Sequence, residues 1–299
     1  MDSEESHQDY YRQNEKYARH LKDWDPNLYA KYADTLKPDT SGGRALDVGC
    51  GVGQVVQRVK DAGFEAHGVD ISEPNIVEAK KVSEHCVLND GKNLPFEDGF
   101  FASVGALNVL EHVEEPEAFI SELVRVVEPG GKIVLSSPNF FRVLGFRDYH
   151  QRMRGVGNKW RNWKRVRAKR RQMKTAPDEV RFDRMAPIVR EDFQPDDDAI
   201  IATNALEMKF FLERAGCEVE TVACTDRYVN PLVEFALNLF PTRYVMFNSF
   251  LVARKNPDST GEVRVKQNAG PFYICEDEEA GRRMVLRENW RPELAEEFK

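Results

Sequence analysis

The chain has 299 residues, more than the roughly 100–200 of a typical single domain, so we expect one decorated domain or one domain with an extension. Hydrophobic residues make up 41% and charged residues 31%, which excludes a disordered or fibrous chain. The net charge of −7 excludes a protein that is basic throughout, but it leaves room for a local basic patch.

The five cysteines are scattered and form no Cys-x-x-Cys pair, which argues against a structural zinc site and is typical of reduced thiols. The acidic N-terminal residues 1–8 are unlike a signal peptide. The most apolar late stretch, residues 231–253, is interrupted by Glu234, Pro241 and Arg243, so no transmembrane helix is predicted. These features predict a cytoplasmic protein.

Residues 1–40 are predicted to form a helical N-terminal cap, because Tyr10, Tyr17 and Leu21 recur near helical spacing among charged residues. Strands and helices then alternate, with strands expected at 44–48, 65–70, 85–88, 100–107 and 132–136 and helices at 54–62, 73–82 and 116–127. Units of this length predict a parallel sheet with helices on both faces. Right-handed crossovers place the carboxyl ends of the strands on one edge, where ligands bind.

The alternation breaks between residue 140 and about residue 200, and it resumes with a predicted helix at 202–215. Two strands at 218–224 and 244–253, separated by an apolar helical insert at 231–240, are expected to pair as an antiparallel hairpin. The predicted fold is therefore α/β, with a doubly wound, mostly parallel seven-stranded sheet. The main domain covers residues 41–255, with an insert at about 140–200, and residues 256–299 form a C-terminal extension.

The loop Asp47-Val-Gly-Cys-Gly-Val-Gly53 follows the first strand, where its glycines let the backbone turn sharply and approach a ligand closely. A dinucleotide fingerprint would need its third glycine at position 54, which is Gln54. Asp47 would repel a pyrophosphate, but it suits a cationic ligand bearing an ammonium or sulfonium. Asp70 ends the next strand, where a carboxylate can bind two ribose hydroxyls.

An ordered set of motifs now resembles a known family; it consists of Ala45–Gln54, Gly68–Ser72, Asn89–Gly91, Leu110–Val113 and Val127–Lys132. This set looks like the class I S-adenosylmethionine-dependent methyltransferases, and most nearly like the small-molecule branch that includes ubiquinone-biosynthesis O-methyltransferases. The resemblance is close over residues 40–140 and loose over 202–254. It implies a Rossmann-like methyltransferase fold and S-adenosylmethionine as cofactor, while it says little about the substrate.

The resemblance also implies cofactor-binding roles, beginning with a group that faces the methionine part of the cofactor: Asp47, Gly49, Gly51 and Gly53. Asp70 would hold the ribose hydroxyls, and Ile71 would pack near the adenine. Asp90 and Gly91 would lie at the adenine edge, and Asn108 would lie near the methionine. Ordinary structural roles remain open for three of them: a helix cap for Asp70, a turn for Asp90 and a loop cap for Asn108.

Two histidines are candidate catalytic bases, because a hydroxyl acceptor must lose a proton. His112 follows the fourth strand at the ligand edge, where it could instead orient the loop or pack beside Pro116. His150 follows the fifth strand, where the resembled family builds its acceptor site, and its alternative is an ordinary exposed loop histidine. No spacing in the sequence resembles a metal triad, so no metal is predicted.

A strongly basic run covers residues 142–174, with thirteen Lys or Arg and one acidic residue, Asp148. Trp160 and Trp163 lie one helical turn apart within it. Three interpretations stay open. The run could be a solvated helix that pairs with acidic parts of the same chain, such as Asp196–Asp198. It could bind an anionic membrane, or a lipid-phosphate or anionic glycan acceptor. It could bind nucleic acid, although no recognition module is present.

Taken together, these patterns predict an S-adenosylmethionine-dependent methyltransferase for a small-molecule or lipid- or sugar-linked acceptor. Oxygen is the expected attacking atom, on family likeness alone. One alternative is an RNA methyltransferase that uses the basic run, and the other is a cofactor-binding interaction protein without catalysis. Peripheral contact with an anionic membrane through residues 142–174 is a further expectation.

Overall fold

The computed structural model describes residues 21, 25–145, 148, 150–188, 196–257, 272–277 and 281–286. Contacts divide the chain into one unit at residues 1–255 and another at 256–299. The second unit contains β8 (Phe272–Asp277) and β9 (Gly281–Leu286), which pair antiparallel. All other elements belong to the first unit.

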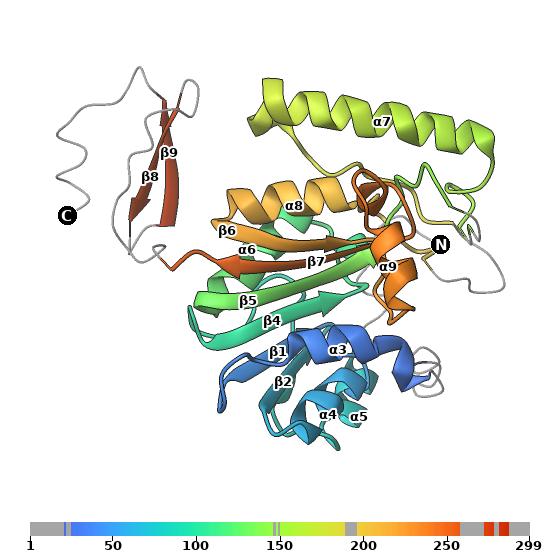
Figure 1. Ribbon diagram of the computed structural model, residues 1–299. Helices are drawn as coiled ribbons and strands as arrows, with labels where there is room; N and C mark the ends of the chain where they lie inside the picture. The colour runs from blue at the N-terminus through green and yellow to red at the C-terminus, as the bar shows by residue number, and fades with distance from the viewer. Residues whose placement is uncertain are drawn as a thin grey trace, which may run out of the picture. The chain divides into compact units, whose positions relative to one another are not determined.

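A seven-stranded sheet forms the centre of the first unit (Figure 1). Its strands are β1 (Arg44–Val48), β2 (Glu65–Asp70), β3 (Cys86–Leu88), β4 (Phe101–Leu107), β5 (Val127–Pro138), β6 (Cys217–Ala223) and β7 (Asn248–Lys255). Their order is β3-β2-β1-β4-β5-β7-β6. The first five are parallel, and β7 runs antiparallel to both β5 and β6. This confirms the predicted mostly parallel sheet with an antiparallel C-terminal hairpin.

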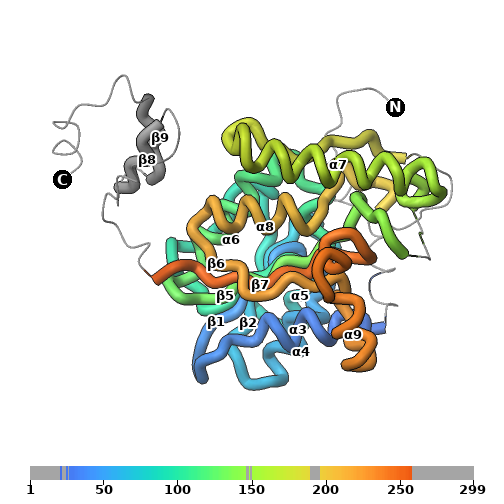
Figure 2. The backbone as a smooth tube through the Cα atoms, turned by 45° about the horizontal axis from the view of Figure 1, so that its top comes forward, coloured from blue at the N-terminus to red at the C-terminus, as the bar shows by residue number. Residues whose placement is uncertain are grey.

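Helices cover both faces of the sheet, as the strand–helix alternation predicted (Figures 1 and 2). The α-helices are α3 (Ala30–Leu36), α4 (Gln54–Asp61), α5 (Glu73–Ala79), α6 (Pro116–Val126), α7 (Val156–Thr175), α8 (Ala205–Arg214) and α9 (Pro231–Leu237). Short 3₁₀ helices are η1 (Pro26–Tyr29), η2 (Leu110–His112), η3 (Pro177–Glu179) and η4 (Thr242–Tyr244). The helices α3, α4 and α5 share one buried cluster, α6 and α8 share another, and α7 packs on α8.

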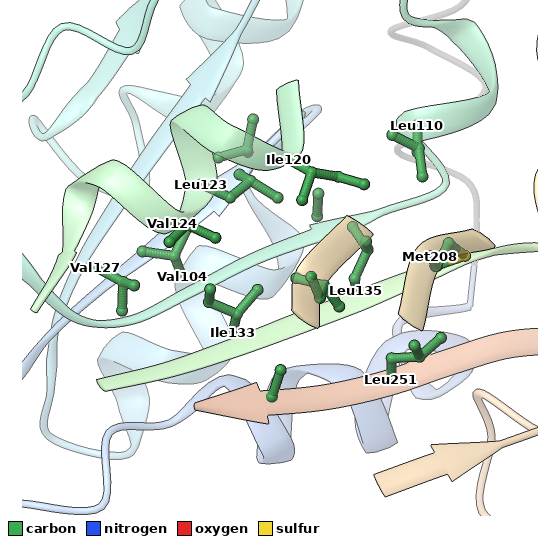
Figure 3. Packing of buried hydrophobic residues seen from close by; sticks show 14 of the residues in the cluster. Val104, Leu110, Ile120, Leu123, Val124, Val127, Ile133, Leu135, Met208 and Leu251 are labelled. Carbon is green, nitrogen blue, oxygen red and sulfur yellow. The ribbon is translucent and has the colours of Figure 1, made fainter. Parts of the chain in front are cut away.

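Packing of apolar side chains holds α6 and α8 on the sheet (Figure 3). Ile120 and Leu123 of α6 and Met208 of α8 are almost completely buried against Leu135 of β5 and Leu251 of β7. Burial of an aliphatic side chain of this size contributes about 1.5–3 kcal/mol. The same cluster includes Val48 of β1, Val69 of β2 and Val104 of β4, the strands whose carboxyl ends carry the candidate site.

The last strand starts four residues later than predicted, at Asn248 rather than Tyr244. Tyr244 ends η4, and the Asn139 amide donates hydrogen bonds to the carbonyl oxygens of Tyr244 and Met246, each over 3.0 Å. These carbonyls therefore have partners outside the sheet. The chain joins the ladder only at Asn248, opposite Pro138.

The two outer strands of the sheet differ from the buried ones. The strand β3 has only three residues, and β6 exposes Glu218 and Glu220 and has a register shift between Val219 and Thr221.

In the part of the chain that the structure describes, none of the helices combines the length and apolarity that a membrane span requires.

Candidate active site

A cavity of about 230 Å³ opens at the carboxyl ends of β1, β2 and β4. It brings together most of the residues that the sequence indicated: Asp47, Gly49, Gly51, Asp70, Ile71, Gly91, Asn108 and His112. Three other predicted residues, Gly53, Asp90 and His150, are not among its described lining residues. The carboxyl edge of the sheet therefore does gather polar side chains from separate strand–helix turns, as the topology requires.

The glycine loop passes very close to the turn that follows β4. Gly49 has a φ of +76°, and a Cβ atom built there would lie 2.3 Å from Cγ2 of Val109. A side chain is excluded on both counts, so the loop needs glycine at this position. Gly53 has a φ of +88° at the start of α4 and lies against Ala79 of α5, which places it behind the cavity.

Asp70 is held rigidly at the end of β2. Its carboxylate accepts hydrogen bonds from the backbone N–H groups of Gly51 and Ser72, each over 2.8 Å, and from the Asn75 amide over 3.3 Å. Burial raises the pKa of Asp70, while these hydrogen bonds oppose that rise. A carboxylate has about four acceptor positions, so capacity remains for a ligand hydroxyl.

Asn75 is a site residue that the sequence analysis missed. It is 2% exposed and lines the cavity, and its Oδ1 has no hydrogen-bond partner in the structure. A buried acceptor without a partner is costly, so a ligand donor at this point would be stabilising. Its only sequence signal is its place in the first turn of the helix after Asp70.

Asp47 lies at the end of β1 and is buried. The Tyr32 hydroxyl donates a hydrogen bond to Asp47 Oδ1 over 2.8 Å. Burial raises the pKa of Asp47 to about 7, and this hydrogen bond opposes the rise. A cationic ligand beside the carboxyl would favour its ionised form.

Two cavity-lining residues adopt a backbone conformation that is uncommon outside glycine. Asn108 has a φ of 53° and Asp196 a φ of 62°, and they are the two non-glycine residues with positive φ in the described part of the chain. Such backbone positions cluster at functional sites. Asn108 directly follows β4, and its N–H donates to the carbonyl of Ser136 over 2.9 Å.

His112 lies between two carboxyl groups at the cavity wall. Its Nε2 is 3.9 Å from Glu111 Oε1, and its Nδ1 is 3.9 Å from Asp198 Oδ1. Glu111 is completely buried, and its Oε2 accepts a hydrogen bond from Ser137 over 2.7 Å. Burial, with a smaller effect of Asp196, raises the pKa of Glu111 to about 8. Burial also raises the pKa of Asp198 to about 6.

This group of side chains could accept a proton or hold a cation. The ligand atoms of Glu111, His112 and Asp196 lie within 4.8 Å of one another. This group could not be predicted from the sequence, because Asp196 comes from a segment far along the chain. The expectation that no metal is required stays a prediction.

His150 and Asp90 lie elsewhere. His150 is 2% exposed, its Nε2 is 3.9 Å from Asp197 Oδ1, and its ring packs edge-on against Phe140. The alternative of an exposed loop histidine is therefore wrong, and the catalytic role of His150 stays a prediction. The exposed Asp90 carboxylate accepts hydrogen bonds from the N–H groups of Lys92 and Asn93, within a turn in which Asn89, Gly91 and Lys92 line the cavity.

One of the three interpretations of the basic run paired it with Asp196–Asp198, but Asp196 and Asp198 line the cavity. Asp198 pairs with His112, and Asp197 pairs with His150. Tyr29 at the end of η1 is a further lining residue that the sequence did not single out. Its signal, an aromatic residue in the predicted N-terminal helical cap, was too general to select it.

Comparison with known proteins agrees with this geometry. Residues 46–135 match a family model described as a methyltransferase domain. A ubiquinone biosynthesis O-methyltransferase from Thiobacillus denitrificans is 30% identical over 138 residues, which cover 39% of this chain and 57% of the relative. A norajmaline N-methyltransferase from Rauvolfia serpentina is 36% identical over 101 residues, which cover 31% and 35%. In both cases the chain spans less than two thirds of the relative's length.

Among solved structures, a candidate S-adenosylmethionine-dependent methyltransferase from Listeria monocytogenes has a TM-score of 0.51 and is 14% identical. The match covers 78% of this chain and 100% of that one, and it agrees with the fold alone. The family match spans β1 to β5, the segment that carries the glycine loop, Asp70 and His112. Residues 46–135 of this chain are therefore similar to the methyltransferase domain of these proteins.

Proposed function

We propose that the chain transfers a methyl group from S-adenosylmethionine to a hydroxyl group of a small-molecule or lipid- or sugar-linked acceptor. The observation that carries the proposal is one cavity lined by two carboxyl groups, the buried Asp47 and the half-buried Asp70, and by His112. The bound cofactor supplies a methyl group already activated on a positively charged sulfur.

The residues present fit this cofactor. Asp70 has remaining acceptor capacity for the ribose hydroxyls, and Asn75 Oδ1 offers a second, unpartnered acceptor nearby. Gly49 leaves no side chain between the loop and a ligand. Asp47 matches the positive end of the cofactor, as the family resemblance implies.

We assign to His112 the removal of the proton from the acceptor hydroxyl. Positioning supplies much of the rate of such a displacement, and a base adds to it when the attacking group is a hydroxyl. A ring nitrogen of His112 would take the proton, and the Asp198 carboxylate, 3.9 Å from Nδ1, would favour the charged form of the ring. The choice of oxygen over nitrogen as the attacking atom rests on the family resemblance alone.

Calorimetry with S-adenosylhomocysteine tests the cofactor site. Asp70→Asn should weaken binding by about a hundredfold, because hydrogen bonds to a charged group contribute roughly 1.5–3 kcal/mol each. Asp61→Asn, an exposed carboxyl near the end of α4, is the matched control and should leave the affinity unchanged. Equal affinities for the wild type and Asp70→Asn would remove the ribose assignment.

A transfer assay tests the reaction. Methyl-labelled S-adenosylmethionine is incubated with separate lipid, glycan, small-molecule and RNA fractions. Label in any of the first three supports the proposal, whereas label in RNA selects the RNA methyltransferase. No transfer to any fraction, with binding of S-adenosylhomocysteine intact, selects a cofactor-binding protein without catalysis.

A further inference from the structure

The helix α7 presents many cations that have no carboxylate partner among the residues that the structure describes. Within the described residues, seven of its side chains form no ion pair with a carboxylate: Arg161, Lys164, Arg165, Arg167, Arg170, Arg171 and Lys174. Two other cations of α7 have partners within the chain: Lys159 forms an ion pair with Asp148, and Lys169 forms ion pairs with Asp183 and Glu207. The remaining charge favours an anionic partner.

Aromatic side chains accompany these cations. Trp160 and Trp163 stack with their ring centroids 4.8 Å apart, although they are 56% and 37% exposed. Lys164 lies over the ring of Trp160 and Arg167 over the ring of Trp163. Exposed tryptophan beside Lys and Arg is the composition of a surface that rests at the interface of a lipid membrane.

The helix α9 and the residues after it form an apolar continuation of this region. Five of their side chains are exposed: Leu232 (80%), Val233 (49%), Phe235 (69%), Leu239 (50%) and Phe240 (65%). The Arg170 guanidinium lies 5.5 Å from the ring centroid of Phe240, so the apolar segment meets α7 there. We call the seven cations, the two tryptophans and these five residues the α7–α9 surface. Exposed apolar groups in such number mark an interaction site.

The α9 part of the α7–α9 surface lies near the cavity. Lys31 of α3 forms an ion pair with Glu234 of α9, and Tyr29, just before α3, lines the cavity. Figures 1 and 2 both show α9 next to the N-terminal end of α3, at the carboxyl edge of the sheet. A partner that covered α9 would therefore be close to the acceptor.

We propose that the α7–α9 surface binds an anionic lipid membrane, with α7 lying along the headgroups and the apolar residues of α9 entering the headgroup–acyl boundary. Each Lys or Arg near such a surface contributes about 1 kcal/mol of attraction. This inference rests on the proposed function, since it names the source of the acceptor: a lipid-linked molecule presented at the membrane.

Other occupants fit the surface less well. A nucleic acid would neutralise the cations, but the side chains of α9 would stay in water, and burial of apolar surface contributes about 25 cal/mol per Å². A second copy packed through a two-fold axis would bring the same unpaired cations of both copies together. An anionic membrane matches both parts of the surface, because its headgroups can pair with the cations of α7 and its apolar interior can bury the side chains of α9.

Co-sedimentation with vesicles tests the proposal with the full chain. Vesicles of phosphatidylcholine alone are compared with vesicles in which a third of the lipid is phosphatidylglycerol, at rising salt. Binding should require phosphatidylglycerol and should weaken with salt, because screening shortens the reach of the charges. Binding to neither vesicle, or equally to both, overturns the proposal.

Two sets of substitutions separate the halves of the surface. Replacement of Arg161, Lys164, Arg167 and Arg171 by Gln should lower vesicle affinity on the order of a hundredfold or more. Leu232→Ser with Phe235→Ser should lower it about tenfold or more through lost apolar burial. Val77→Ser with Lys80→Gln on and beside α5, where both positions are exposed, is the matched control and should change nothing.

Binding to a polyanion distinguishes the occupants. A single-stranded RNA serves as competitor, and the Leu232→Ser/Phe235→Ser variant is the decisive protein. If that variant binds vesicles as tightly as the wild type does, or if RNA is bound and vesicles are not, the surface is a polyanion site and the membrane proposal is wrong. Asp70→Asn should lose S-adenosylhomocysteine but keep vesicle binding, so failure at the membrane and failure at the cofactor site are told apart.

Discussion

Two regions of the same unit differ in whether their charged side chains have partners. In the part built from β1 to β5, Arg125 donates to Glu122, to Asp98 and to the carbonyl oxygens of Leu94 and Phe96. On α7, Arg171 and its unpaired neighbours have no carboxylate partner among the described residues. The contrast separates charges that stabilise the fold from charges that remain available to a partner.

The largest expected effect concerns one histidine from each region. His112→Ala should lower turnover by about a hundred- to ten-thousand-fold, because general base catalysis contributes this much, while the affinity for S-adenosylhomocysteine is unchanged. His150→Ala, from the insert, should lower thermal stability more than turnover, since its ring is buried outside the cavity. Steady-state kinetics of both variants measure the loss of turnover. If the two variants lose turnover equally, His150 has a catalytic role.

A smaller effect compares two arginines. Arg125→Ala should lower the free energy of unfolding by about 1–3 kcal/mol, because it removes charge-assisted hydrogen bonds and leaves their acceptors unpaired. Arg171→Ala should change it by less than about 0.5 kcal/mol, as expected for an exposed side chain without a partner. Urea unfolding monitored by circular dichroism measures both. Similar values for the two variants would break the comparison between the regions.

The smallest effect is a pH dependence that arises in the β1–β5 part. Burial raises the folded-state pKa of Glu111 to about 8 and that of Asp47 to about 7, from ordinary values of 4.5 and 3.8. The folded state therefore favours the protonated carboxyls, and their stabilisation is complete below the ordinary values and lost as the pH rises through 7 and 8.

The melting temperature of the ligand-free protein should consequently fall between about pH 5 and pH 9. Glu111→Gln should flatten the upper part of this dependence, and Glu84→Gln, an exposed control, should not. Thermal scans at each pH test this. A curve for Glu111→Gln with the wild-type slope would contradict the assignment.

The sequence predicted the β1–β5 part well because each of its elements depends on local patterns. Short apolar runs mark the strands, a glycine loop precedes α4, and a proline stands near the start of α5 and of α6. The topology then places Asp47 and Asp70 at one edge. The local pattern could also place His112 there, directly after a strand. What it could not show is how completely Glu111 is buried beside His112.

Local patterns could not predict the structure of the insert at about residues 140–200, because the contacts of the insert are long-range. Asp196 and Asp198 reach the cavity, and Glu207 reaches Lys169, from segments that no periodicity connects. His150 lies in a small core that includes Phe141 and Met153, formed where the insert folds back on itself. The count of charged residues correctly predicted that the α7 region is positively charged, but only the structure shows which of its cations are paired.

The outer strands of the sheet have a consequence for how copies of the chain can meet. Joining of two sheets edge to edge needs a long, regular ladder of exposed N–H and C=O groups. The three residues of β3 are too few, and β6 combines exposed glutamates with an interrupted register. Continuous sheets that extend from one molecule into the next are therefore disfavoured at both margins, which protects a protein with so many parallel strands from fibrous aggregation.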